Sequence, residues 1–165
     1  SNPLVKGLLD SLFIGTIAGK TADYECTLFR GSTSSSQSGS SANRIYYVNI
    51  ALLFRQPLNW GLDIFRAGFA QKIGKKLFKN SYIPVPDDRE LESLIVIKAK
   101  SREPVQLLLR NRAVCDQLKA LFSTQGDYHI SDHGIRYKVR GEIIGKDEAL
   151  RVLTILADTA VLFGK

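Results

Sequence analysis

Two histidines come closest, by residue type and spacing, to a metal-binding or catalytic site. His129 and His133 have three residues between them, and Asp127 and Asp132 stand beside them. On a helix this spacing would place both imidazoles on one face, where they could bind zinc. The residues between them instead predict a hairpin turn, and no HExxH glutamate is present. We therefore predict no metal and no cofactor. His129 and His133 are the only candidate metal ligands, and solvated turn residues are the favoured interpretation.

A cluster of carboxylates precedes an apolar stretch, and carboxylates in pairs can act as general acid and base. Catalysis of that kind requires a second element that converges on the first. The simpler interpretation is that these acids favour the amino end of a helical turn. We predict no catalytic residue. An enzyme remains an alternative, which a pocket formed with His129 or Asp127 would support. The cluster consists of Asp87, Asp88, Glu90 and Glu92.

Other chemistry-bearing motifs are missing from the sequence. It contains no Gly-rich phosphate loop, no nucleophile elbow and no CxxC pair. Cys26 and Cys115 each fall in an apolar pattern, which is typical of buried free thiols. The sequence therefore indicates no recognised reaction.

The basic residues are distributed unevenly along the 165-residue chain, whose formal net charge is +7. The first 80 residues carry ten basic and four acidic side chains. Residues 69–79 predict a short amphipathic helix with lysines on one side, as in segments that bind membrane surfaces or acidic partners. The alternative is a helix packed on its own sheet with its lysines in water. The candidate contact residues are Arg66, Lys72, Lys75, Lys76 and Lys79.

A second basic feature is the ridge formed by Arg136, Lys138 and Arg140, which alternate along one predicted strand face. Such a ridge could bind nucleic acid. No aromatic residue interleaves it, Trp60 is the only tryptophan, and Glu142 interrupts it. We therefore rank nucleic acid below an anionic membrane surface or an acidic protein as the partner.

The elements that must position these residues follow from hydrophobic periodicity. Strands are expected at 22–30, 44–54, 94–100, 128–130 and 135–143, with a short strand or a turn at 61–67. Helices are expected at 4–13, 69–79 and 147–163, and residues 105–122 predict either one helix or two helices that break at Asn111. Strands occur in runs and hairpins rather than in βαβ alternation. We predict one α+β domain over residues 1–165, with a single, mainly antiparallel sheet and helices packed on one face.

A serine-rich segment at residues 31–43 contains seven serines among its 13 residues. Such a segment lacks the apolar side chains needed for a core, so we expect a mobile hairpin loop within the domain.

Several segments resemble the C-terminal part of an uncharacterised bacterial domain family. They are YECTLFRG at 24–31, DRELESLIVIKA at 88–99, HGIRYKVRGEI at 133–143 and the closing helix at 146–162. The resemblance implies a cytoplasmic domain of a protein with transmembrane segments, and no known chemistry. The sequence also lacks methionine. We therefore expect part of a longer chain, cytoplasmic and membrane-associated through a segment outside this sequence, with an interaction or scaffold role.

Overall fold

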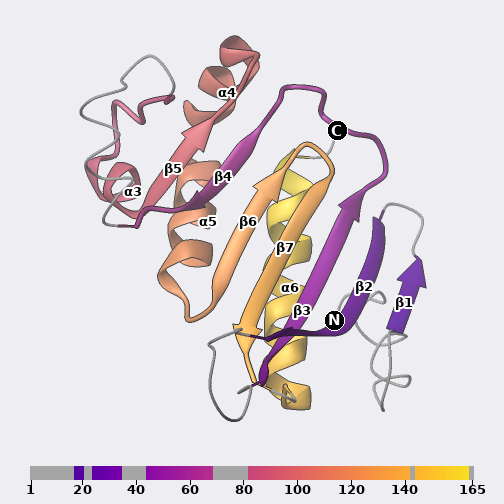
Figure 1. Cartoon of the computed structure of the whole chain (residues 1–165). Helices are drawn as coiled ribbons and strands as arrows, with labels where there is room; N and C mark the ends of the chain where they lie inside the picture. The colour runs from indigo at the N-terminus through magenta and orange to yellow at the C-terminus, as the bar shows by residue number, and fades with distance from the viewer. Residues whose placement is uncertain (1–16, 21–23, 35–43, 69–81, 142–143, 164–165) are drawn as a thin grey trace.

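Two strands from distant parts of the chain form the centre of the sheet. In this computed structural model, which describes residues 17–20, 24–34, 44–68, 82–141 and 144–163, β3 (Arg44–Phe54) pairs antiparallel with β7 (Gly134–Arg140). Gly134 starts β7 where the two backbones approach closely, because a Cβ there would lie 2.2 Å from the Leu52 carbonyl oxygen. The first and last thirds of the described chain therefore meet in the middle of the sheet (Figure 1).

The other strands extend the sheet on both sides of this pair. Outside β3 lie β2 (Tyr24–Ser34) and β1 (Ile17–Lys20), of which mainly the backbone is described. Beyond β7 lie β6 (Asp127–Ser131), β4 (Asp63–Arg66) and β5 (Ile95–Lys98). The order is β1-β2-β3-β7-β6-β4-β5 and every pairing is antiparallel.

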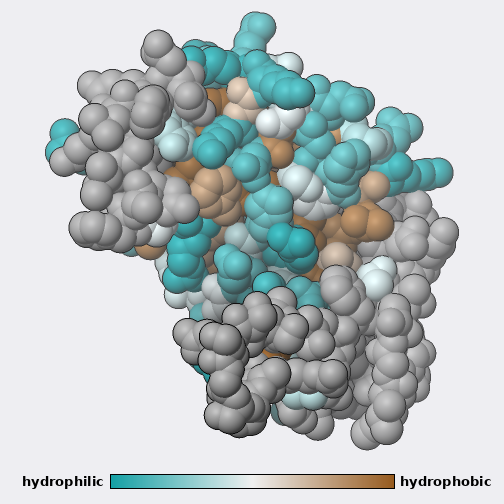
Figure 2. Space-filling view, viewed as in Figure 1, coloured by the Kyte–Doolittle hydropathy of each residue, from teal (hydrophilic) through white to brown (hydrophobic). Residues whose placement is uncertain are grey.

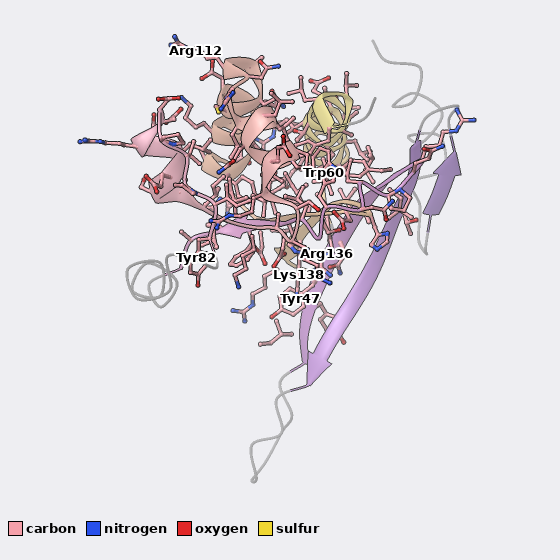
Figure 3. The ribbon with its side chains drawn as sticks, turned by 90° about the horizontal axis from the view of Figure 1, so that it is seen from above. Tyr47, Trp60, Tyr82, Arg112, Arg136 and Lys138 are labelled. Atoms are coloured by element: carbon pink, nitrogen blue, oxygen red, sulfur yellow. The ribbon has the colours of Figure 1, made fainter. Side chains whose placement is uncertain are left out.

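The described helices cover one face of this sheet (Figures 1 and 3). They are α3 (Arg89–Leu94), α4 (Arg102–Leu109), α5 (Arg112–Ser123) and α6 (Lys146–Phe163). Helix α6 lies behind β3 and β7, and α5 lies beside it behind β6. The prediction of an α+β fold with one antiparallel sheet and helices on one face is confirmed.

The core lies between the helices and the face of the sheet that they cover. Alternate strand residues point into it, including Ile50 of β3, Ile130 of β6 and Tyr137 of β7, all fully buried. Tyr128 packs against Tyr137 with ring centroids 4.9 Å apart. Burying each large apolar side chain contributes about 1.5–3 kcal/mol, so this layer holds the helices on the sheet.

Short elements differ from the prediction more than long ones. Strand β1 was not expected, α3 extends the helical turn expected at the acidic cluster to six residues, and β2 continues to Ser34, four residues into the segment for which a loop was expected. The rest of that segment and the helices expected at 4–13 and 69–79 lie outside the described residues. The break at Asn111 is confirmed, because its side chain accepts a hydrogen bond from the N–H of Ala113 and caps α5.

The hairpin of β2 and β3 does not stay in the plane of the sheet. Its far end, around Ser34 and Arg44, curves away from the helices and projects on the opposite side (Figure 3). The far end of β3 remains attached to the sheet through the N–H of Gly141, which donates to the carbonyl of Tyr46. The uncovered face is therefore bordered on one side by a raised hairpin.

None of the helices in the described ranges combines the length and the apolar character required to cross a membrane.

Candidate functional site

The face of the sheet turned away from the helices is the candidate site, and we call it the open face. No helix of the described part of the chain packs on it (Figure 3). Figure 2 looks onto it and shows hydrophilic side chains over the central strands, with hydrophobic surface between them. Its chemistry-bearing side chains come from five strands: Tyr47, Arg136, Lys138, Arg140, Asp127, His129, Asp63, Phe65 and Lys98.

Lysines lie over aromatic rings at two places on the open face. The ammonium of Lys138 is 4.0 Å from the ring centroid of Tyr47 on the neighbouring strand. The ammonium of Lys98 is 5.3 Å from the ring of Phe65 and 5.5 Å from that of Tyr82. These distances are within the range of cation–π attraction. The open face therefore combines positive charge with aromatic rings that are only partly buried.

Two arginines of β7 supply positive charge that no described carboxylate neutralises. Arg136 and Arg140 are exposed, and within the described ranges neither forms an ion pair. Arg140 stands opposite Tyr47 in the β3–β7 register, and Arg136 stands opposite His129 on β6. Together with Lys138 they form the predicted ridge, and the strand alternation that placed them on one face is confirmed.

His129 interacts with a carboxylate on the neighbouring strand rather than with His133. Its Nε2 atom lies 2.5 Å from Oδ1 of Asp63 on β4, and both side chains are partly exposed on the open face. His133 is exposed in the β6–β7 turn. Among the described residues, no three or more His, Cys, Asp or Glu side chains group in a way that could hold a metal ion.

Asp132, which follows the β6 strand, has a structural role in the same turn. Its Oδ1 accepts hydrogen bonds from the backbone N–H groups of Trp60 and Leu62, at 3.1 and 2.9 Å. Its Oδ2 accepts one from the N–H of Gly61, at 2.7 Å. One carboxylate thus holds the chain that leads from β3 into β4. Asp127, by contrast, is exposed and stands opposite Lys138 in the register.

The acidic cluster caps a helix. Asp88 is the N-cap of α3 and accepts a hydrogen bond from the N–H of Leu91. Lys119 of α5 lies 2.9 Å from Asp88 and 3.1 Å from Asp116. The Leu91 N–H and the Lys119 ammonium hold the pKa of Asp88 below its usual value, and the carboxylates, Asp88 foremost, raise the pKa of Lys119 to about 12.

The cluster's other acids remain at the surface. Glu90 and Glu92 lie in the first turn of α3, where negative charge is favourable, and Asp87 is exposed beside them.

Of the residues predicted for membrane contact, the structure describes Arg66. It is exposed at the end of β4, and its guanidinium donates a hydrogen bond to the Thr124 carbonyl at 2.7 Å. Because Thr124 is the C-cap of α5, this positive charge lies at the negative end of that helix. Lys72, Lys75, Lys76 and Lys79 lie outside the described residues, so the predicted basic helix stays a prediction.

Cys115 is buried, as its pattern predicted, and its thiol donates to the Leu109 carbonyl. Burial first, and then the negative charge of Asp88, raises the pKa of this thiol. A thiol that stays protonated is a poor nucleophile, which agrees with a structural role. The side chain of Cys26 lies outside the described set.

Comparison of the chain with known proteins found no matching family model, no matching curated protein and no matching solved structure.

Sequence reasoning identified the ridge but missed its aromatic neighbour. Tyr47 lies on a different strand, and only the β3–β7 register places its ring against Lys138. The available signal was the alternation of β3, in which Tyr47, Asn49 and Ala51 fall on the face opposite Ile50. Tyr47 therefore supplies the aromatic ring that the ridge lacks in the sequence.

Proposed function

We propose that this domain is a non-catalytic interaction module that binds a polyanionic partner through its open face. The observation that carries the proposal is the pair of exposed arginines, Arg136 and Arg140, which have no acidic partner in the described part of the chain. Lys138 between them and Lys98 at the far side add charge to the same face. Positive charge gathered on one face attracts polyanions at long range and in a salt-dependent way.

The acids on this face do not cancel its charge. Asp63 is held by His129, and Asp127 is the other carboxylate on this face among the described side chains. Of the described side chains on the open face, four are therefore basic and two are acidic, and the exposed arginines are on the central strand.

Salt elution from immobilised heparin tests this proposal, because heparin is a polyanion without bases. The variant Arg136→Glu/Arg140→Glu should elute at clearly lower salt than the unmodified protein. The matched control is Arg89→Glu/Arg112→Glu, which changes the net charge equally at the first residues of α3 and α5. Acidic residues are favourable at those positions, so the control should fold. Equal shifts in the two variants, or no shift in either, would refute the proposal.

A membrane surface is the second candidate partner, favoured by the run of five basic residues without an acid between Arg66 and Lys79. Co-sedimentation with phosphatidylserine-containing vesicles at low salt tests it. The variant Lys72→Glu/Lys75→Glu/Lys76→Glu/Lys79→Glu should lose binding, because the anionic surface attracts each lysine by about 1 kcal/mol. Absence of binding by the unmodified protein, or unchanged binding by the variant, would remove this candidate.

A further inference from the structure

Cations and aromatic rings alternate across the open face. Tyr47 on β3 is followed by Lys138 and Arg136 on β7, by Phe65 on β4 and by Lys98 on β5. Four inter-strand steps separate β3 from β5, which corresponds to roughly 19 Å at the usual strand spacing. The aromatic and basic groups thus lie along a path that crosses the strands (Figure 3).

We propose that the polyanion bound by the open face is a single-stranded nucleic acid, with a base stacked on Tyr47 and phosphates on Arg136, Lys138 and Arg140. This inference rests on the proposed function, since it names the partner of the same face. Binding of single strands generally combines a basic surface that follows the backbone with aromatic rings that stack the bases.

The contact between Lys138 and Tyr47 suits this role energetically. At an exposed site a cation–π contact is worth about 0.5–1 kcal/mol. Stacking of a base on an aromatic ring is worth about 1–3 kcal/mol. A base can therefore replace the lysine on the ring, and the flexible lysine stem can carry its ammonium to an adjacent phosphate. Without ligand, the same lysine covers an otherwise solvent-facing ring.

The geometry favours a single strand over a duplex. The faces of the bases are accessible only where the strand is unpaired, and a duplex would offer Tyr47 no surface for stacking. Readout of a duplex through its major groove usually uses a helix or a two-stranded ribbon, whereas the ridge lies within the sheet. The raised end of the β2–β3 hairpin borders the face on one side and would obstruct a wide, rigid ligand.

Among the described residues, two acidic side chains lie on this path and reduce its net positive charge. Asp63 is engaged by His129, and Asp127 is exposed opposite Lys138. Phosphates are therefore expected at the β3–β7 end of the face, where Arg136 and Arg140 have no acidic partner among the described residues.

Fluorescence anisotropy with two labelled ligands tests the proposal. One is an oligothymidylate of about 16 nucleotides, the upper site size for one small binding fold. The other is an abasic deoxyribose-phosphate strand of equal length, which has the same charge but no bases. We expect the oligothymidylate to bind more tightly. Tyr47→Ala should weaken its binding at least about fivefold, the equivalent of losing one stacked base, and leave the abasic strand unaffected.

Further variants guard against misfolding of the alanine variant. Tyr47→Phe keeps the ring and should bind like the unmodified protein, whereas Tyr47→Leu keeps apolar cover without a ring and should behave like Tyr47→Ala. Arg136→Glu/Arg140→Glu should weaken binding of both strands.

The outcomes separate this inference from the proposed function. If both strands bind equally and Tyr47→Leu changes neither, while the arginine variant weakens both, base stacking is refuted and polyanion binding stands. If heparin binds but neither strand does, the nucleic acid is refuted alone. Binding of anionic vesicles only, lost in Arg136→Glu/Arg140→Glu, refutes it in favour of a membrane. If neither heparin nor either strand binds, both proposals fail.

Discussion

Replacing Asp132 by alanine should destabilise the whole domain. The substitution leaves three backbone N–H groups, those of Trp60, Gly61 and Leu62, without the carboxylate that accepts their hydrogen bonds. A hydrogen bond to a charged group contributes about 1.5–3 kcal/mol when buried. These groups are only partly buried, so water replaces some of that loss. We expect a decrease of about 3 kcal/mol in the free energy of unfolding, which for a domain of this size lowers Tm by roughly 10 °C.

Urea unfolding followed by two probes measures this effect. Trp60 is the only tryptophan in the chain and lies in the segment that Asp132 holds, so its fluorescence reports locally. Far-UV circular dichroism reports the sheet and helices together. In Asp132→Ala both transitions should move to lower urea concentration. The fluorescence midpoint should be equal to or lower than the circular dichroism midpoint. The control His133→Ala alters the next residue, which is exposed in the same turn. If the free energy of unfolding of Asp132→Ala lay within about 0.5 kcal/mol of that of the control, the three hydrogen bonds would contribute little.

Three further predictions concern other contacts. The pKa of Asp88 is lower in the folded chain than its unfolded value of about 3.9, so its stabilising effect is complete above that pH and is lost as pH falls through the folded pKa. In Asp88→Ala, the free energy of unfolding from urea titrations should fall less steeply as pH decreases, and it should be about 1 kcal/mol lower at pH 7 because the helix cap is lost. An unchanged dependence on acidic pH would contradict this role of Asp88. Gly126→Ala should cost about 3 kcal/mol or more in thermal melts, because its φ is +115° and a Cβ would lie 2.1 Å from the Tyr137 ring. Gly145→Ala, where a Cβ meets nothing within 4 Å, should cost about 1 kcal/mol or less, and equal losses would refute the steric argument. Burial, and then Glu148, raise the pKa of Tyr137 to about 12, so one tyrosine should ionise late in an ultraviolet titration and disappear in Tyr137→Phe; a late transition that survives would belong to another side chain.

Regular patterns along the chain were sufficient to predict the long elements. The alternation of β3 and β7 predicted both strands and the two faces of β7. The sequence left one helix or two open at residues 105–122, and the structure has two, because the side chain of Asn111 caps α5. Strand β1 has four residues, one of them Gly19, and it depends on pairing with β2. A segment of that length carries almost no periodic signal of its own.

The candidate site was predictable only in part, for a related reason. The ridge is a property of one strand, so its spacing is visible in the sequence. The approach of Tyr47 to Lys138 and of Asp63 to His129 depends on which strands are neighbours. The sheet order inserts β7 and β6 between β3 and β4, although β4 follows β3 in the chain. Nothing in the local pattern of either strand specifies that insertion.

The same strand order has a consequence for how the chain acquires its structure. One edge of β3 pairs with β2, but the other edge pairs only with β7, which comes about 80 residues later in the chain. During synthesis on a ribosome, the β2–β3 hairpin would therefore emerge with one edge unsatisfied until most of the chain had been made. Because pairing of such separated segments is slow, we expect folding to be limited by the joining of β3 to β7. The first half of the chain alone should be prone to aggregation, because the unpaired edge of β3 can pair with other chains. Pairing with β7 would cover that edge.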